Sequence, residues 1–149
     1  MLSLIGTAPE KEQRMKSLVT IIVLTMISSS AIAGELKPFT SDGCSSFPDG
    51  TIAQQNLWLE CCVEHDKAYW AGGTEEQREI ADEKLKKCVT KVGQPEIAKL
   101  MLAGVRVGGT PHLPTSFRWG YGWPFPRGYK ALTEQEMLEV KEKLAARPE

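Results

Sequence analysis

One short stretch of the sequence, CCVEHDKAYW at residues 61–70, gathers side chains that could do chemistry. An imidazole exchanges protons near neutral pH, and a carboxylate can fix the imidazole tautomer or bind a metal ion. On a helix, His65 and Asp66 project about 100° apart, so they cannot act on each other directly. Tyr69 lies on the same face as His65, one turn further on. We therefore expect separate tasks for the imidazole and the neighbouring carboxylate.

Two helices are expected to position these groups. No Gly or Pro interrupts residues 56–70, and the Ala-Gly-Gly sequence at 71–73 ends this predicted helix. Thr74 followed by Gln77 has the spacing of a capping box, so a second helix should run over about 75–92. The short connection favours an antiparallel pair.

The partner of His65 is expected on the second helix. If Cys61 bonds to Cys88, moving one turn (~6 Å) up the first helix places Asp82 roughly level with His65. The angular match between Asp82 and Cys88 is imperfect on an ideal helix, and the nearby glutamates of the same helix could be mistaken for this acid. A carboxylate on one imidazole nitrogen fixes the tautomer and leaves the other nitrogen free as a base.

Asp66 needs a different partner. A hard cation such as Ca²⁺ takes oxygen ligands from carboxylates and backbone carbonyls. The loop SDGCSSFPDG, residues 41–50, offers Asp42 and carbonyls held by small residues. A bridge between Cys44 and Cys62 would tie this loop beside the start of the first helix, close to Asp66. The alternative role for Asp42 is a turn-capping side chain.

All four cysteines lie after residue 33. An even number in a short exported chain favours two disulfides over free thiols. A bridge between the adjacent Cys61 and Cys62 would be strained, so one of them should pair with Cys44 and the other with Cys88. Zinc binding by the adjacent thiols and the His-Asp sequence is the alternative, but an oxidising compartment consumes free thiols as disulfides.

Residues 1–33 have the anatomy of a secretory signal peptide. An apolar run at 18–26 is followed by a small-x-small ending, so cleavage is expected after Ala33, and translation could begin at Met15. The run is shorter than the ~20 residues of a membrane span, and an uncleaved anchor is the alternative. Residues 34–149 are expected to form a single domain that is exported, either to the periplasm or by secretion.

The bulk composition excludes several classes of function. The formal net charge is −1, so no basic surface for nucleic acid is indicated. No zinc-finger spacing or Gly-rich phosphate loop occurs, and the G-x-S-x-G sequence of serine hydrolases is missing. The part after the signal is mildly acidic, so charge alone does not favour binding to an anionic membrane.

Three segments follow the predicted helix pair. Residues 96–107 and 133–146 are expected to be helical, the second with a capping box. Residues 109–130 are rich in Pro, Gly and aromatic residues and should be irregular. Their aromatic side chains suit either a membrane interface or a cover packed over the helices, and we favour the cover. The helix at 96–107 could line an acyl channel, although a core role is more common.

The spacing of these motifs resembles a known family. C-C-x-x-H-D-x-x-Y at 61–69 is similar to the active-site helix of secreted phospholipases A2. Asp-Gly-Cys-Ser at 42–45 resembles the calcium loop of that superfamily, closer to its bacterial and fungal members than to the Gly-rich animal loop. A-D-x-x-L-x-x-C at 81–88 has the family's spacing from catalytic Asp to cysteine. The similarity covers about residues 39–92, and residues 94–149 match nothing in the family.

The resemblance implies an all-α fold with a disulfide-linked core of two antiparallel helices, an N-terminal calcium loop and extra C-terminal helices. It also implies a role for each matched residue. His65 would be the base that activates water, Asp82 would orient its ring, and Tyr69 would support the pair by hydrogen bonding. The ligands of Ca²⁺ would be Asp66, the Gly43 carbonyl and the Asp42 carboxylate. The implied disulfides are Cys44–Cys62 and Cys61–Cys88.

The activity implied by the resemblance is calcium-dependent hydrolysis of a phospholipid acyl ester at a membrane surface, with release of a fatty acid and a lysophospholipid. The alternative is a catalytically inactive protein of the same fold that binds lipid or contacts membranes. The intact His65, Asp66, Tyr69 and Asp82 motif favours the enzyme, because a decayed enzyme is expected to lose its base or its calcium ligand first.

Overall fold

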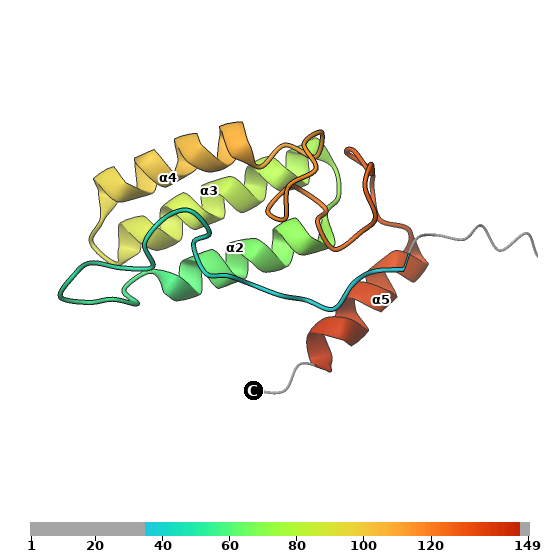
Figure 1. The fold of residues 1–149 in the computed structure, drawn as a ribbon, viewed down its shortest axis with the longest axis horizontal. Coiled ribbons are helices and arrows are strands. Elements are labelled where there is room, and N and C mark those ends of the chain that lie inside the picture. The colour runs from blue at the N-terminus through green and yellow to red at the C-terminus, as the bar shows by residue number, and fades with distance from the viewer. Residues whose placement is uncertain (1–34, 147–149) are drawn as a thin grey trace, which may run out of the picture. The chain divides into compact units, whose positions relative to one another are not determined.

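The computed structural model describes residues 35–146 of the 149-residue chain (Figure 1). The predicted signal peptide lies outside the described residues. The helices are α2 (Leu59–Ala71), α3 (Glu75–Lys91), α4 (Pro95–Gly108) and α5 (Glu134–Ala145). Residues 35–146 contain no strand, so the expected all-α class is confirmed for this part of the chain.

Local signals set most of the helix ends. The side chains of Thr74 and Thr133 cap α3 and α5, each in a capping box with the residue three positions later, as the sequence predicts. Pro95 occupies the first turn of α4, where its missing N–H leaves no helix hydrogen bond unmade. Gly72, with φ of 70°, ends α2 and donates its N–H to the Ala68 carbonyl.

The start of α2 differs from the sequence prediction. A helix is expected from residue 56, but α2 begins at Leu59. The backbone N–H of Trp58 donates to the Asp49 carbonyl at 3.0 Å, and its indole N–H donates to the Pro48 carbonyl at 2.6 Å. These long-range bonds hold the chain before α2 in turns and fasten the preceding loop to the helix start.

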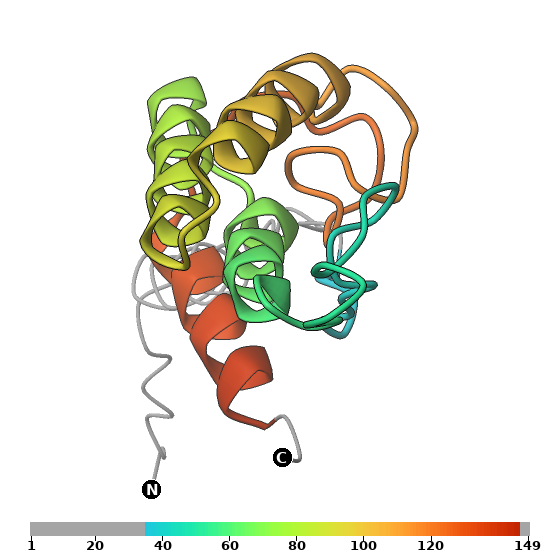
Figure 2. The ribbon, with the colours of Figure 1, turned by 90° about the vertical axis from the view of Figure 1, so that its left-hand side faces the viewer.

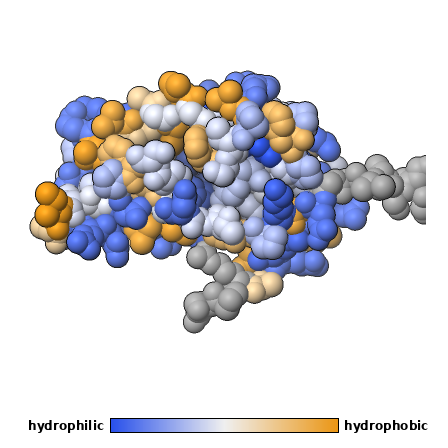
Figure 3. All heavy atoms as spheres, in the orientation of Figure 1, coloured by the Kyte–Doolittle hydropathy of each residue, from blue (hydrophilic) through white to orange (hydrophobic). Residues whose placement is uncertain are grey.

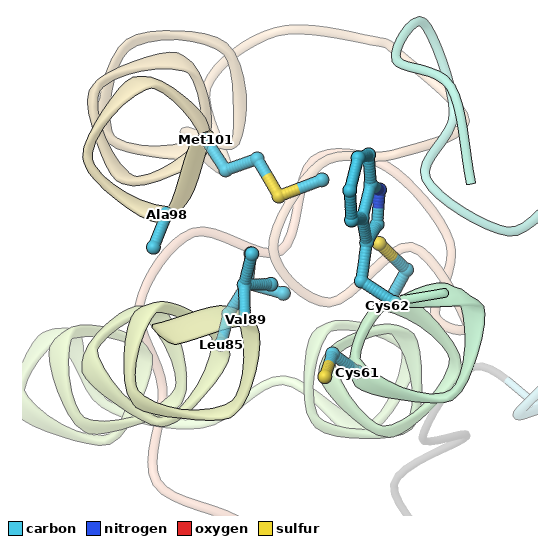
Figure 4. Packing of buried hydrophobic residues seen from close by; sticks show 7 residues of the cluster. Cys61, Cys62, Leu85, Val89, Ala98 and Met101 are labelled. Atoms are coloured by element: carbon cyan, nitrogen blue, oxygen red, sulfur yellow. The ribbon is translucent and has the colours of Figure 1, made fainter. Parts of the chain in front are cut away.

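The three helices α2, α3 and α4 form the main core. α2 and α3 lie side by side and run in opposite directions, and α3 also packs against α4 (Figures 1 and 2). Side chains from the three helices point toward one another in Figure 4. The buried members of this cluster are Trp58, Cys61, Cys62, Leu85, Val89, Ala98 and Met101. Burial of each large apolar side chain contributes roughly 1.5–3 kcal/mol of stability.

Two disulfides fasten this core. Cys44 bonds to Cys62 and Cys61 bonds to Cys88, the pairs that the family resemblance implies. The first ties the loop at 41–50 to α2, and the second joins α2 to α3. Both bridges use all four cysteines of the chain, so no thiolate is left for the alternative zinc site.

The irregular segment at 109–133 packs onto the helices, as the favoured interpretation has it. Trp119 and Trp123 are each 1% exposed. Trp119 packs with Tyr69, and Trp123 packs with Trp70 in a second apolar cluster that α5 also covers. Within the described part of the chain, no helix has the length and apolar character needed to span a bilayer.

Candidate active site

His65 on α2 and Asp82 on α3 face each other across the helix pair. His65 Nε2 lies 3.0 Å from Asp82 Oδ1. The carboxylate is fully buried, whereas the imidazole is 8% exposed and lines a cavity. Among residues 35–146, the second ring nitrogen of His65, Nδ1, has no hydrogen-bond partner. With the proton on Nε2, the ring presents a free lone pair at Nδ1.

Tyr69 supports this pair from one turn further along α2. Its hydroxyl donates to Asp82 Oδ1 at 2.7 Å, and its ring lies against the imidazole with centroids 4.2 Å apart. Burial, together with the negative charge of Asp82, raises the pKa of Tyr69 well above its ordinary value. The phenol therefore remains a protonated donor, so Asp82 Oδ1 receives two hydrogen bonds that fix it.

The other oxygen of Asp82 faces Arg106 near the end of α4. Arg106 Nε lies 3.0 Å from Asp82 Oδ2, an ion pair whose N–H is not directed well enough for a hydrogen bond. The two glutamates that could have been mistaken for the acid have other partners. Glu79 pairs with Arg106 through Nη1, and Glu83 pairs with Lys86 on the surface. Asp82 is thus the α3 acid that meets the imidazole.

Arg78 is buried and makes several hydrogen bonds next to the His65–Asp82 pair. Its Nε donates to the Tyr69 hydroxyl at 3.1 Å, and Nη1 donates to the Tyr129 hydroxyl at 2.7 Å. Nη2 donates to the carbonyls of Val105 and Arg106, each at 2.8 Å. Burial lowers the pKa of Arg78, but the hydrogen bonds to the two tyrosines outweigh it and the net pKa is raised. Because the Tyr69 oxygen accepts from Arg78, its own proton is directed to Asp82.

Asp66, the next residue along α2, lines both the cavity beside His65 and a second pocket of about 200 Å³. Its Oδ2 accepts a hydrogen bond from Ser41 Oγ at 2.7 Å. The pKa of Asp66 is raised to about 6, mainly by burial. The hydrogen bond from Ser41 and the nearby His65 oppose this rise, and the carboxylates of Asp42 and Asp49 add to it. Asp66 is therefore a half-buried acid with other acids near it and no ion-pair partner among residues 35–146.

The loop at 41–50 brings the other expected ligands close to Asp66. Asp42 is exposed and lines the second pocket, and its Oδ1 accepts from Ser45 Oγ at 2.9 Å, which is the turn-capping contact. Gly43 is buried at φ of 74° and lines the main cavity. The Asp49 carboxylate fills the space where a Cβ on Gly43 would lie, and its Oδ1 accepts the Cys44 N–H at 2.8 Å.

The oxygens around Asp66 fit a hard cation. In the described part of the chain, no three His, Cys, Asp or Glu side chains gather closely enough to ligate one ion. A cation here would need hydroxyl, carbonyl or water oxygens in addition to the carboxylates, a mixture that Ca²⁺ accepts. Besides the two aspartates, the oxygen-bearing residues that line the pocket are Thr40, Ser41, Ser45, Ser116 and Tyr121. These are oxygen donors, the type of ligand that Ca²⁺ prefers.

The imidazole opens onto a cavity of about 410 Å³. His65, Asp66 and Tyr69 form its polar wall. The apolar wall comes from Phe47, Leu85, Leu100, Met101, Val105 and Phe117. α4 contributes side chains both to the core and to the wall of this cavity. Figure 3 shows hydrophobic side chains along the upper edge, over α4. Two apolar side chains of this helix, Leu100 and Val107, are exposed.

Sequence reasoning missed several residues of this site. An arginine in the last turn of a helix, such as Arg106, normally indicates a solvated charge that complements the helix dipole. Arg78 lies among charged residues in the first half of α3, and nothing in its spacing indicates burial. The role of Asp49 could have been predicted from the sequence. It lies in Pro-Asp-Gly, a turn sequence in which the Asp side chain commonly accepts hydrogen bonds from backbone N–H groups.

Comparison with known proteins adds no relative. The sequence matches no family model, and no curated protein or solved structure matches it significantly. The function is therefore inferred from the geometry of the site and from the motifs of the sequence.

Proposed function

We propose that this chain is a calcium-dependent hydrolase of phospholipid acyl esters, similar to the secreted phospholipases A2. One observation supports this most: His65 is held at Nε2 by the fully buried Asp82 and lines an apolar cavity of about 410 Å³. The next residue, Asp66, lines both this cavity and the oxygen-rich second pocket. The proposed base, the proposed cation site and the apolar cavity thus adjoin one another.

His65 acts as the base in this proposal. Its Nδ1 takes a proton from a water molecule as that water attacks the ester carbonyl. When the acyl C–O bond breaks, the imidazolium gives this proton to the leaving oxygen of the lysophospholipid. Asp82 accepts the Nε2–H throughout and stabilises the imidazolium that forms. Tyr69 donates to the same oxygen of Asp82, and Arg78 donates to the Tyr69 hydroxyl. General-base assistance of this kind contributes about 10²–10⁴-fold in rate.

The cation site supplies the second part of the proposal. The carboxylates of Asp66 and Asp42 and the carbonyl of Gly43 are the groups that would hold Ca²⁺. When held there, Ca²⁺ would polarise the ester carbonyl as a Lewis acid and would stabilise the developing oxyanion. The raised pKa of Asp66 fits this role, because burial and neighbouring acids disfavour its charged form until a positive charge compensates it.

The cavity indicates an apolar substrate segment. Its walls are mostly aliphatic and aromatic side chains, with the polar groups of His65 and Asp66 at one side. An acyl chain placed along these walls would leave its ester near the imidazole. The products would be a fatty acid and a lysophospholipid. The two disulfides fit an oxidising compartment, and we propose that the protein is exported to the periplasm or secreted.

The alternative is an inactive protein of similar fold that binds lipid or contacts membranes. Such a protein would not need a fully buried carboxylate beneath an imidazole. Desolvation of a buried ion costs on the order of several kcal/mol, and the braced His65–Asp82 pair has no evident use in lipid binding. The geometry therefore favours the enzyme.

The proposal is tested with the purified protein and vesicles of mixed zwitterionic and anionic phospholipids. Fatty acid and lysophospholipid should appear in equal amounts when calcium is present, and chelation should stop their release. Activity that is indifferent to chelation would rule out the calcium mechanism. Calcium binding without ester cleavage would instead support the inactive alternative.

A further inference from the structure

Arg106 makes contacts that a surface helix charge does not need. It lies in the last turn of α4, but its guanidinium reaches α3. Nε lies 3.0 Å from Asp82 Oδ2, and Nη1 lies 2.9 Å from Glu79 Oε1. Nη2 also donates to the Glu79 carbonyl at 3.3 Å. Because Glu79 and Asp82 lie three residues apart on α3, they share the face that this one arginine spans.

The two oxygens of Asp82 have different partners. Oδ1 meets His65 and Tyr69, whereas Oδ2 is buried and has no hydrogen-bond partner among the described residues. The Arg106 guanidinium is the positive charge beside Oδ2. Without Arg106, the buried Oδ2 of Asp82 would have neither a hydrogen bond nor a positive charge beside it. The carboxylate could then rotate about its Cβ–Cγ bond so that both oxygens compete for the donors His65 and Tyr69.

We propose that Arg106 is a positioning residue for the base. By pairing with Oδ2, it holds the carboxylate plane of Asp82 so that Oδ1 receives the His65 Nε2–H and Nδ1 stays free toward the cavity. The catalytic consequence rests on the proposed function, but the effect on the His65 tautomer does not. α4 also forms a wall of the cavity. The contact between Arg106 and Asp82 therefore also fixes the position of His65 relative to that wall.

A purely structural role explains these contacts less well. The packing of α4 on α3 is supplied by the apolar cluster that includes Leu85, Val89, Ala98 and Met101. A cation that only complemented the helix dipole would remain in solvent near the α4 carbonyls. The Arg106 side chain is instead only 33% exposed and lies beside a carboxylate that is 0% exposed.

The test compares Arg106→Met, Arg106→Gln and Arg106→Lys with the matched control Lys99→Met. Lys99 lies on the same helix in an exposed pair with Glu96, so its loss removes the same charge without touching the site. We expect the two neutral variants to lower kcat of phospholipid hydrolysis about 10–100-fold, as loss of a supporting contact commonly does, with KM unchanged. Lysine should restore part of kcat, because it offers charge without the planar fork.

A second readout needs no hydrolysis. The chain has two histidines, so the ¹⁵N imidazole signals of His65 can be identified by comparison with His112→Gln. The wild-type neutral ring should be a single Nε2–H tautomer, and Arg106→Met should give a mixture. If neither wild type nor any variant hydrolyses lipid, the proposed function fails. If the neutral Arg106 variants still lose the single Nε2–H tautomer while Lys99→Met keeps it, the positioning role holds.

The opposite results would overturn the proposal. Arg106→Met or Arg106→Gln with the wild-type tautomer and the kcat of Lys99→Met would show that Arg106 does not position Asp82. A loss confined to KM would show the same. If Arg106→Met does not fold by circular dichroism, the same tautomer and kcat criteria apply to Arg106→Gln, which keeps a polar side chain at the α4 end.

Discussion

The side chains of His65 and Asp82 are buried and joined to their neighbours by hydrogen bonds and an ion pair, whereas the loop at 41–50 beside Asp66 is partly exposed and brings like charges together. Asp82 receives hydrogen bonds from α2 and an ion pair from α4. In the loop, Asp42 is bonded only to a serine of its own turn among the described residues. Two disulfides hold both regions to the same helix, α2.

The difference lies in how charge is compensated. Near Asp82 the protein supplies its own cation, Arg106, so the acid and base are assembled before any ligand binds. Near Asp66 the protein supplies further carboxylates, and burial raises the pKa of Asp66 to about 6. In our account the base is preorganised by the fold, and the loop is completed by calcium. Variants that affect one region should therefore spare the other.

Apart from loss of the base itself, the largest effect is expected at Asp82. Asp82→Asn should lower kcat about 10³–10⁴-fold, because an amide cannot hold the productive imidazole tautomer. Calcium binding, measured by titration calorimetry, should not change. Glu83→Gln is the matched control, since it makes the same exchange on the next residue, at the surface. An Asp82→Asn protein as active as this control would contradict the assignment of the acid.

Removal of each disulfide should show which of the two regions calcium stabilises. Replacing either pair by alanine should lower the free energy of unfolding by about 3 kcal/mol, because the closed loops are similar, with separations of 18 and 27 residues. Urea unfolding with and without calcium measures this. Loss of Cys44–Cys62 should also abolish much of the stabilisation by calcium, whereas loss of Cys61–Cys88 should not. Equal calcium responses would show that the loop does not hold the cation.

Asp66→Lys should remove calcium binding and turnover together, by placing a positive charge where the cation would bind. We expect calcium affinity to fall at least about 100-fold, since even supporting contacts are worth about 10–100-fold. The rise in Tm with calcium reports the loss. Glu64→Lys, which makes the same charge change at an exposed position on α2, should bind calcium normally. The His65 tautomer should be unchanged in both variants.

The smallest effect is expected at Gly43. A Cβ there would displace the Asp49 carboxylate, and the left-handed backbone adds strain of about 1–2 kcal/mol. Gly93→Ala is the control, because Gly93 also has positive φ but faces open space. Thermal unfolding should show similar strain in both variants. Only Gly43→Ala should lose calcium affinity, and an equal affinity in the two variants would remove Asp49 and Gly43 from the account.

Local patterns explain why the helices could be predicted. The capping boxes at Thr74 and Thr133 and the breaks at Gly72 and Pro95 act within a few residues, so they are readable in the sequence. The start of α2 could not be read in this way. It depends on bonds from Trp58 to a loop ten residues earlier, which override the helical pattern.

In the candidate site, too, local patterns could be read from the sequence and long-range contacts could not. His65, Asp66 and Tyr69 are adjacent on one helix, and the motif spacing places Asp82 on the next. The contact between His65 and Asp82 could not be predicted with certainty, because Asp82 and Cys88 do not project in the same direction on an ideal helix. The packing of α2 against α3 in the structure was needed to show it. Arg106 could not be found from sequence, since its role depends on where α4 crosses α3.

The most direct test of the central claim is the initial rate of fatty-acid release by wild type and His65→Asn at equal calcium occupancy. The account predicts that His65→Asn binds calcium like wild type and releases fatty acid about 10²–10⁴-fold more slowly, because the general base is lost. Release by His65→Asn at the wild-type rate would contradict the claim that this imidazole, held by Asp82, is the base.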